Sequence, residues 1–324
     1  MTTDETIVVV GGGVSGLTTG IALLEAGLPV RLLAAEIPAR TSLAAGAMWG
    51  PYLVEPWPRA RGWSLTALEV FRELAGDPRT GVCMVSGIEA ARHPASAPDW
   101  GELLPDLRRC TTDELPPGFA VGYHFTVPLI DMPVYLSYLQ GRFADAGGMV
   151  EVRMLASIDE VERAAALVNC AGLGAGPLVG DDGLRPIRGQ HVVVENPGIS
   201  EFFSEDTGMS PDLACIYPHG DTVVLGGTAI DGDGTLAPDS VAAAGILARC
   251  AAIDPRLANA HIIEDRIGAR PTRYEVRLEL DHRSDGLPLV HNYGHGGAGV
   301  TLSWGCAREV AQIMKVALPS RSKR

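Results

Sequence analysis

The sequence predicts a mixed α/β fold in which a nucleotide-binding domain with a parallel sheet is interwoven with a second, β-rich domain. The first reason is size, because 324 residues, 46% of them apolar, exceed one hydrophobic core and indicate two domains. The second is a pair of glycine-rich turns, each between a strand pattern and a helix pattern, at residues 7–26 and 289–307. The third is the stretch 189–228, whose apolar residues alternate with period two, as in an antiparallel sheet.

The N-terminal unit predicts a dinucleotide-binding turn. Ile7–Val10 has the pattern of a buried strand, and Gly11, Gly13 and Gly16 then form GxGxxG before a helix over 17–26. Glycine lets a ligand approach the backbone closely, and the first turn of the helix offers unpaired N–H groups to a pyrophosphate. Nicotinamide and flavin enzymes share this Rossmann-like pattern, so by itself it does not choose between them.

The second strand, expected over 30–34, ends in Ala34, where many dinucleotide-binding enzymes carry an acid that binds the adenosine ribose. The missing acid weakens the hypothesis of a nicotinamide dehydrogenase. Glu36 is the nearest acid, and it is either a ribose ligand or an ordinary loop carboxylate.

The rest of the chain alternates between the two domains. We expect helices at 64–75, 131–147, 240–252 and 305–316, strands at 149–155, 166–169 and 270–279, and a β-rich insertion with long loops at 77–130. These elements assign residues 1–76, 137–185 and 284–324 to the nucleotide-binding domain. Residues 77–136 and 186–283 form the predicted substrate-binding domain.

The C-terminal glycine run carries a specific resemblance. In the stretch LVHNYGHGGAGVTLSWGCA, the fixed positions are Leu289, Val290, His291, Asn292, Tyr293, Gly294, Gly296, Gly297, Gly299, Gly305 and Ala307. Together with GxGxxG and the pattern RPxRxxxRLE in GARPTRYEVRLE (268–279), it resembles the FAD-dependent D-amino acid oxidase family, which has a glutathione-reductase-type FAD-binding fold. The likeness extends to AGAMWGPY (45–52), VNCAG (168–172), IRGQHVVV (187–194) and CIYPHGDTVVLGGT (215–228).

The resemblance implies FAD as the cofactor. The residues that it places around FAD are Gly11, Gly13, Val14, Ser15, Gly16, Glu36, Thr41, Ala45, Gly46, Met48, Leu155, Cys170, Ala171, Gly172, Gly296, Gly297, Ala298, Gly299, Val300 and Thr301. The helix expected from Gly305 would direct its positive end at the reduced flavin. His291 and His295 fit structural, hydrogen-bonded histidines of a tight turn better than acid–base groups.

Arg273 is the residue expected to bind the substrate carboxylate, because it matches the second arginine of RPxRxxxRLE and a guanidinium binds a carboxylate in a bidentate manner. Without the motif, an arginine in so charged a strand would be a surface ion-pair member. Arg270 and Arg277 are expected to be structural. Glu275 would share the face of Arg273, unless a twist or bulge separates them.

The expected substrate wall departs from the family. Members carry an active-site tyrosine at the start of a Tyr-x-x-Pro stretch, where this chain has Cys215. Tyr217 lies two residues on, on the same face of an extended strand, and is expected to place its phenol at the pocket, against the alternative of an ordinary buried aromatic. Ala47, Met48 and Gly50 complete the expected pocket, and the resemblance gives the Gly297 carbonyl to the substrate amine.

The resemblance implies FAD-dependent oxidative deamination of D-amino acids to 2-oxo acids, ammonia and hydrogen peroxide. The small or apolar residues expected in the pocket favour D-amino acids with neutral or apolar side chains. The alternatives are a glycine- or sarcosine-type amine oxidase, a D-aspartate or D-glutamate oxidase, and a flavin-binding protein without oxidase activity.

The resemblance implies a small-molecule D-amino acid and oxygen as partners, and the composition argues against other kinds of partner. A net charge of −13 without a basic patch argues against nucleic acid and anionic membrane, and no apolar run reaches the length of a membrane span. The N-terminus MTTDET lacks the features of a signal peptide, and the six cysteines are widely spaced, so we expect reduced thiols and a cytoplasmic protein. No group of His, Cys or Asp residues has the spacing of a metal site, so we expect no metal. The protein could form a homodimer, which the sequence does not decide.

Overall fold

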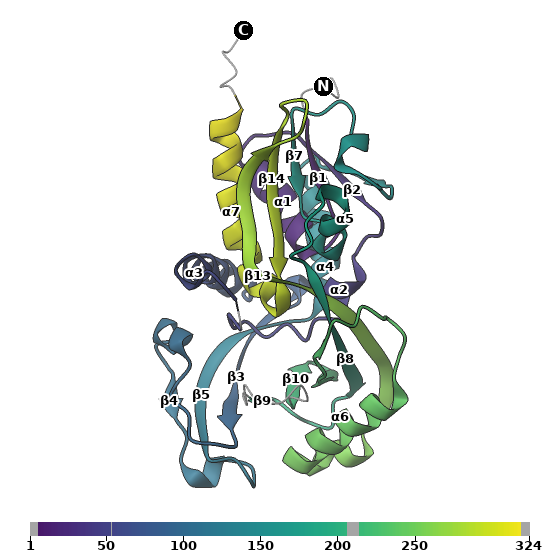
Figure 1. The fold of residues 1–324 in the computed structure, drawn as a ribbon. Coiled ribbons are helices and arrows are strands. Elements are labelled where there is room, and N and C mark those ends of the chain that lie inside the picture. The colour runs from purple at the N-terminus through teal and green to yellow at the C-terminus, as the bar shows by residue number, and fades with distance from the viewer. Residues whose placement is uncertain (1–5, 53, 206–213, 319–324) are drawn as a thin grey trace.

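The computed structural model describes residues 6–52, 54–205 and 214–318, so most of MTTDET, on which the localisation prediction partly depends, lies outside the described residues. Its strands form one mixed sheet of 14 strands in the order β4-β5-β3-β9-β10-β11-β8-β13-β14-β7-β1-β2-β6, with β12 paired to β8. Figure 1 shows the parallel end of this sheet at the top and the antiparallel end at the bottom. The predicted mixed α/β class is confirmed.

The parallel end consists of β6 (Met149–Val152), β2 (Val30–Ala34), β1 (Ile7–Val10), β7 (Ala166–Asn169) and β14 (Pro288–His295). All four residues of β1 are buried, because β1 pairs with β2 on one side and β7 on the other and helices cover the sheet. The strand expected to run to residue 155 ends at Val152.

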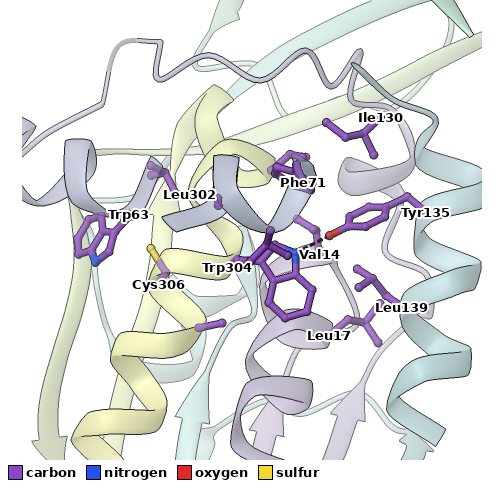
Figure 2. Close-up of a cluster of buried hydrophobic side chains, with 14 of the residues drawn as sticks. Val14, Leu17, Trp63, Phe71, Ile130, Tyr135, Leu139, Leu302, Trp304 and Cys306 are labelled. Atoms are coloured by element: carbon purple, nitrogen blue, oxygen red, sulfur yellow. Dashed lines mark hydrogen bonds between the residues drawn. The ribbon is translucent and has the colours of Figure 1, made fainter. Parts of the chain in front are cut away.

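Four long helices pack at this end of the sheet. They are α1 (Val14–Glu25), α3 (Trp57–Leu74), α4 (Met132–Asp145) and α7 (Gly299–Ala317), with α1 against α4 and α7, and α3 against α7. Figure 2 shows the core between them, where the buried Trp304 indole donates a hydrogen bond to the hydroxyl of Tyr135 at 2.8 Å. This bond satisfies two polar groups that burial would otherwise leave unpaired.

The last helix begins earlier than its sequence indicated. We expected its start at Gly305, but α7 begins at Gly299, directly after the single turn η8 (Gly296–Ala298). Gly305 lies inside α7, where a Cβ would overlap the backbone of Trp63 on α3. The expectation was wrong because this glycine permits close contact between two helices and does not mark a helix start.

The antiparallel end consists of β3 (Val82–Ala91), β4 (Arg108–Arg109), β5 (Val121–Ile130), β8 (Arg185–Glu195), β9 (Phe202–Glu205), β10 (Cys215–His219), β11 (Thr222–Gly226) and β12 (Ile230–Asp231). The exception to antiparallel pairing is β3 with β9, which is parallel. The helix α6 (Ser240–Ile253) packs on β8 and β11, and the Asp239 side chain caps its first turn. Of two short helices, α2 (Arg40–Leu43) lies at the junction of the two ends, and α5 (Ala175–Val179) lies beside the parallel end.

A single long strand joins the two ends. β13 (Ile262–His282) pairs with β8 through its first half and with β14 through its second half, and its register shifts between Thr272 and Arg277. The domain boundary predicted between residues 283 and 284 therefore falls within a continuous sheet. The proposed division of the chain into two domains stays a prediction.

Candidate active site

A cavity of about 1230 Å³ extends from the carboxyl ends of β1 and β2 to the face of the antiparallel strands. Of the residues expected around the cofactor, all except Gly16 and Ala298 line this cavity. The six residues expected at the substrate, Arg273, Tyr217, Cys215, Ala47, Met48 and Gly50, also line it. The fold thus brings nearly the whole predicted set to one space, although the residues come from both ends of the chain.

The N-terminal glycine turn has the shape of a pyrophosphate cradle. Gly11 has a positive φ of 125°, and a Cβ on it would overlap the carbonyl of Cys170, so the turn requires glycine there. Gly13 precedes α1 without a side-chain cap, and the N–H of Val14 donates to Ser42 Oγ at 3.0 Å. The other N–H groups of the first turn lack intrahelical acceptors and are available to an anion.

The acid expected at the ribose is engaged elsewhere. One carboxylate oxygen of Glu36 accepts the backbone N–H of Arg40 at 2.8 Å, at the start of α2. This contact fits the alternative that Glu36 is an ordinary loop carboxylate. Because Glu36 also lines the cavity, its binding to the ribose stays a prediction. Thr41, also on α2, donates its hydroxyl to the carbonyl of Ala269 at 3.2 Å and so connects α2 to β13.

The C-terminal glycine turn closes over the opposite side of the cavity. The Thr301 hydroxyl of α7 donates to the carbonyl of Gly50 at 3.1 Å, which holds the segment 45–52 against the start of the helix. Behind the turn, the His295 ring bonds to Asn292 Oδ1 at 3.0 Å, and the Asn292 amide donates to Thr19 on α1 at 3.0 Å. His291 likewise bonds to Asp281, at 3.4 Å. Both histidines therefore have structural partners.

The two arginines of the RPxR motif lie on opposite sides of β13. Arg273 lies at the rim of the cavity, where its Nε donates to Asp181 at 3.1 Å and its Nη1 to the carbonyl of Glu275 at 3.2 Å. Arg270 lies over Gly189, with Nη1 donating to the Thr228 carbonyl at 3.1 Å. Burial lowers the pKa of Arg270, and it forms no ion pair within the part of the chain that the structure describes.

This arrangement changes the site expected from the sequence. Both arginines border the cavity, but residue 270 has the parity of Gly268, which lies opposite Gly189 on β8, whereas Arg273 lies at the rim and is bound to Asp181. The geometry favours Arg270, which the sequence reasoning treated as structural. The odd spacing in RPxR indicates that the two arginines point to different sides, but only the register of β13 against β8 shows that Arg270 is the one over Gly189. Glu275 is exposed, lies within the register shift of β13 between Thr272 and Arg277, and does not line the cavity, so it does not compete with a substrate there.

The wall of the cavity contains Tyr217, Cys215 and His191. The phenol of Tyr217 contacts the Ser204 hydroxyl at 3.3 Å, and a Cβ on Gly46 would lie 3.0 Å from its ring. Burial raises the pKa of the Cys215 thiol to about 12, so the thiol stays protonated. His191, which the sequence reasoning did not single out, lies beside both and bonds through Nδ1 to the Ala44 carbonyl at 2.8 Å.

Glycine turns from both ends of the chain, facing one cavity, are typical of the class of dinucleotide-binding oxidoreductases. The chain belongs to the FAD-dependent oxidoreductase family, whose model matches residues 6–313, and its cofactor is FAD. A D-amino-acid oxidase of Rubrobacter xylanophilus is 48% identical over 96% of this chain and 96% of its own length. A D-amino-acid oxidase of Streptomyces coelicolor is 44% identical over 96% and 97%.

Among solved structures, a glycine oxidase from Bacillus cereus shares the fold with a TM-score of 0.79, at 18% identity over 99% of each chain. None of the helices in the described ranges is long and apolar enough to cross a membrane. No cluster of candidate metal ligands occurs in those ranges either.

Proposed function

We propose that this protein oxidatively deaminates D-amino acids to 2-oxo acids, ammonia and hydrogen peroxide. The observation that carries the proposal is the Arg270 guanidinium, which lies in the cavity beside the glycine turn at 296–297 and has no carboxylate partner within the described residues. A partly buried cation of this kind is stabilised by an anionic ligand, and a guanidinium binds a carboxylate with two parallel hydrogen bonds.

The chain's own residues bind and orient the substrate. Arg270 holds the carboxylate, and Gly297 and Tyr217 line the same cavity. The chemistry that bound FAD supplies is acceptance of the Cα hydride and transfer of its electrons to oxygen. The imino acid then reacts with water to give the 2-oxo acid and ammonia.

The lining favours substrates with neutral or apolar side chains. Met48, Trp100 and Tyr217 present apolar surface to the cavity, and Glu89 adds a carboxylate to the same wall. A D-aspartate or D-glutamate side chain would need a second cation in the cavity to bind its carboxylate. We therefore place D-alanine, D-valine and D-methionine ahead of acidic substrates.

The test is anaerobic mixing of the purified holoenzyme with single D- and L-amino acids while flavin absorbance is followed. We expect bleaching by neutral D-amino acids and none by their L-enantiomers. Reduction by L-enantiomers alone, or preferential turnover of glycine and N-methyl amines, would overturn the substrate assignment. A yellow protein that no amine reduces would indicate a flavin-binding protein without oxidase activity.

Cytoplasmic location and a homodimer are further proposals. The acidic composition and the widely spaced cysteines support the first, and the second rests on two-fold homodimers being the commonest soluble oligomers. Cell fractionation and light scattering during size-exclusion chromatography test them.

A further inference from the structure

His191 occupies the centre of the cavity wall. It lies on β8 opposite Gly226 of β11, which in turn lies opposite Cys215 of β10, so these three positions share the face of the sheet that lines the cavity. A Cβ on Gly226 would overlap both the His191 ring and the Cys215 sulfur. The glycine therefore provides the space in which the imidazole lies.

The hydrogen bond of Nδ1 fixes the state of the ring. Its partner is the Ala44 carbonyl oxygen at 2.8 Å, and a carbonyl only accepts, so Nδ1 carries the hydrogen. In the neutral ring Nε2 is then an acceptor with a free lone pair. Nε2 has no hydrogen-bond partner in the described part of the chain, and the residue is 9% exposed. Nε2 is not among the buried side-chain atoms that lack a partner, so its lone pair is accessible from the cavity that His191 lines, where the N–H of a ligand can donate to it.

The charge of the neighbouring residue keeps the ring neutral. Burial lowers the pKa of His191 to about 4, and the positive charge of Arg270 contributes to this shift. Arg270 lies over Gly189, two residues before His191 on the same face of β8, roughly 7 Å away along the strand. The wall thus presents a cationic donor and a neutral acceptor side by side.

This pair complements the two polar groups of an α-amino acid. The lone pair of Nε2 repels a carboxylate, so it does not duplicate Arg270, but it attracts an N–H of an amine. Since both groups of the substrate are attached to one carbon, holding each of them leaves only one face of that carbon directed at the flavin.

We propose that His191 is a substrate-binding residue whose Nε2 accepts a hydrogen bond from the amine of an amino acid held by its carboxylate on Arg270. The inference rests on the proposed function and deepens it. In this chain the wall position Cys215 contributes no hydroxyl, and the imidazole supplies a polar contact of a different kind, directed at the amine and not at the carboxylate.

The experiment compares two ligands that differ only in the amine. 2-Aminoisobutyrate lacks an α-hydrogen and cannot be oxidised, and isobutyrate is the same molecule without the amine. Their dissociation constants are measured with the holoenzyme from the flavin absorbance change and, independently of the flavin, by calorimetry. The variants are His191→Phe, which retains a planar ring without an acceptor, and His191→Leu. Tyr217→Phe is the control, because it removes a hydroxyl from the same wall and leaves the imidazole in place.

We expect both His191 variants to bind 2-aminoisobutyrate about tenfold more weakly, the loss of one hydrogen bond with a charged partner, and isobutyrate within twofold of the wild type. Equal weakening of both ligands would overturn the proposal, because it would indicate that His191 only holds the segment at Ala44. Unchanged affinities would overturn it too.

A measurement on the unaltered protein covers the case in which neither variant folds. With ¹⁵N-labelled histidine, the Nε2 resonance of His191 should shift on binding of 2-aminoisobutyrate and stay in place with isobutyrate; the same shift with both ligands overturns the proposal. Failure of the proposed function looks different, since neutral D-amino acids would then leave the wild-type flavin oxidised.

Discussion

Arg270 and Arg273 stand three positions apart on one strand, and this odd spacing directs their side chains to opposite faces. Asp181 binds the outward-facing Arg273 and also lies 3.5 Å from Arg277, so two of the three arginines in the motif belong to one ion-pair cluster. Arg270 is left to bind a ligand.

The two arginines make a matched pair for mutagenesis. Arg270→Ala should raise KM for neutral D-amino acids by about a hundredfold or more, because a charge-assisted bidentate contact is lost. Arg273→Ala should leave KM within about threefold and reduce stability by about 1 kcal/mol or less, as for a partly exposed ion pair. Steady-state kinetics on FAD-loaded variants measure both; the reverse result would restore Arg273 as the carboxylate-binding residue.

Cys215 is expected to be chemically inert. Burial raises the pKa of its thiol to about 12, so no thiolate forms between pH 6 and 10, and a hydride transfer needs no nucleophile. Cys215→Ala should keep kcat within about twofold and show the same pH profile as the wild type. A loss of tenfold or more in kcat would assign the sulfur a role in the reaction.

At the scale of elements, the contact between α3 and α7 depends on a glycine that the sequence pattern placed at a helix start. Gly305 lies inside α7, and the backbone of Trp63 occupies the space where its side chain would be. The two helices approach closely at this point, and α7 in turn fixes Thr301 against Gly50 at the cavity.

Gly305→Ala should therefore lower the free energy of unfolding by about 1–3 kcal/mol, because the added methyl separates two packed helices. The control is Gly62→Ala on the exposed side of α3, where no atom lies within 4 Å of a new Cβ. This substitution should raise the free energy of unfolding by up to about 1 kcal/mol. Urea denaturation of the three proteins gives the comparison. Equal stability of Gly305→Ala and the wild type would contradict the close contact.

For the whole molecule, the continuous strand β13 predicts that the two ends of the sheet unfold together. It pairs with β8 at one end and with β14 at the other, so neither end can lose its strands without disturbing a shared neighbour. FAD lies against both glycine turns by the proposed arrangement and should strengthen this coupling.

We expect one cooperative calorimetric transition for the holoenzyme, and a lower midpoint after FAD is removed. At a hundredfold excess over its dissociation constant, FAD contributes about 2.7 kcal/mol to the free energy of unfolding. Scanning calorimetry with and without added FAD measures the shift. Two separate transitions in the holoenzyme would show that the ends are independent.

The sequence alone determined the properties that depend on local patterns. The turn at Gly11 to Gly16, the strand Ile7–Val10, the cap at Asp239 and the segments that line the cofactor cavity all follow from glycine placement, burial periodicity and capping chemistry, which act over a few residues. The FAD-dependent family was recognisable from the same short motifs.

Only the tertiary structure decided which side chains meet in the cavity. The choice between Arg270 and Arg273 depends on the register of β13 against β8, and the free Nε2 of His191 depends on a carbonyl 147 positions away in the sequence. Register and such distant contacts are set when strands from different parts of the chain pair, so they leave no mark in the local pattern.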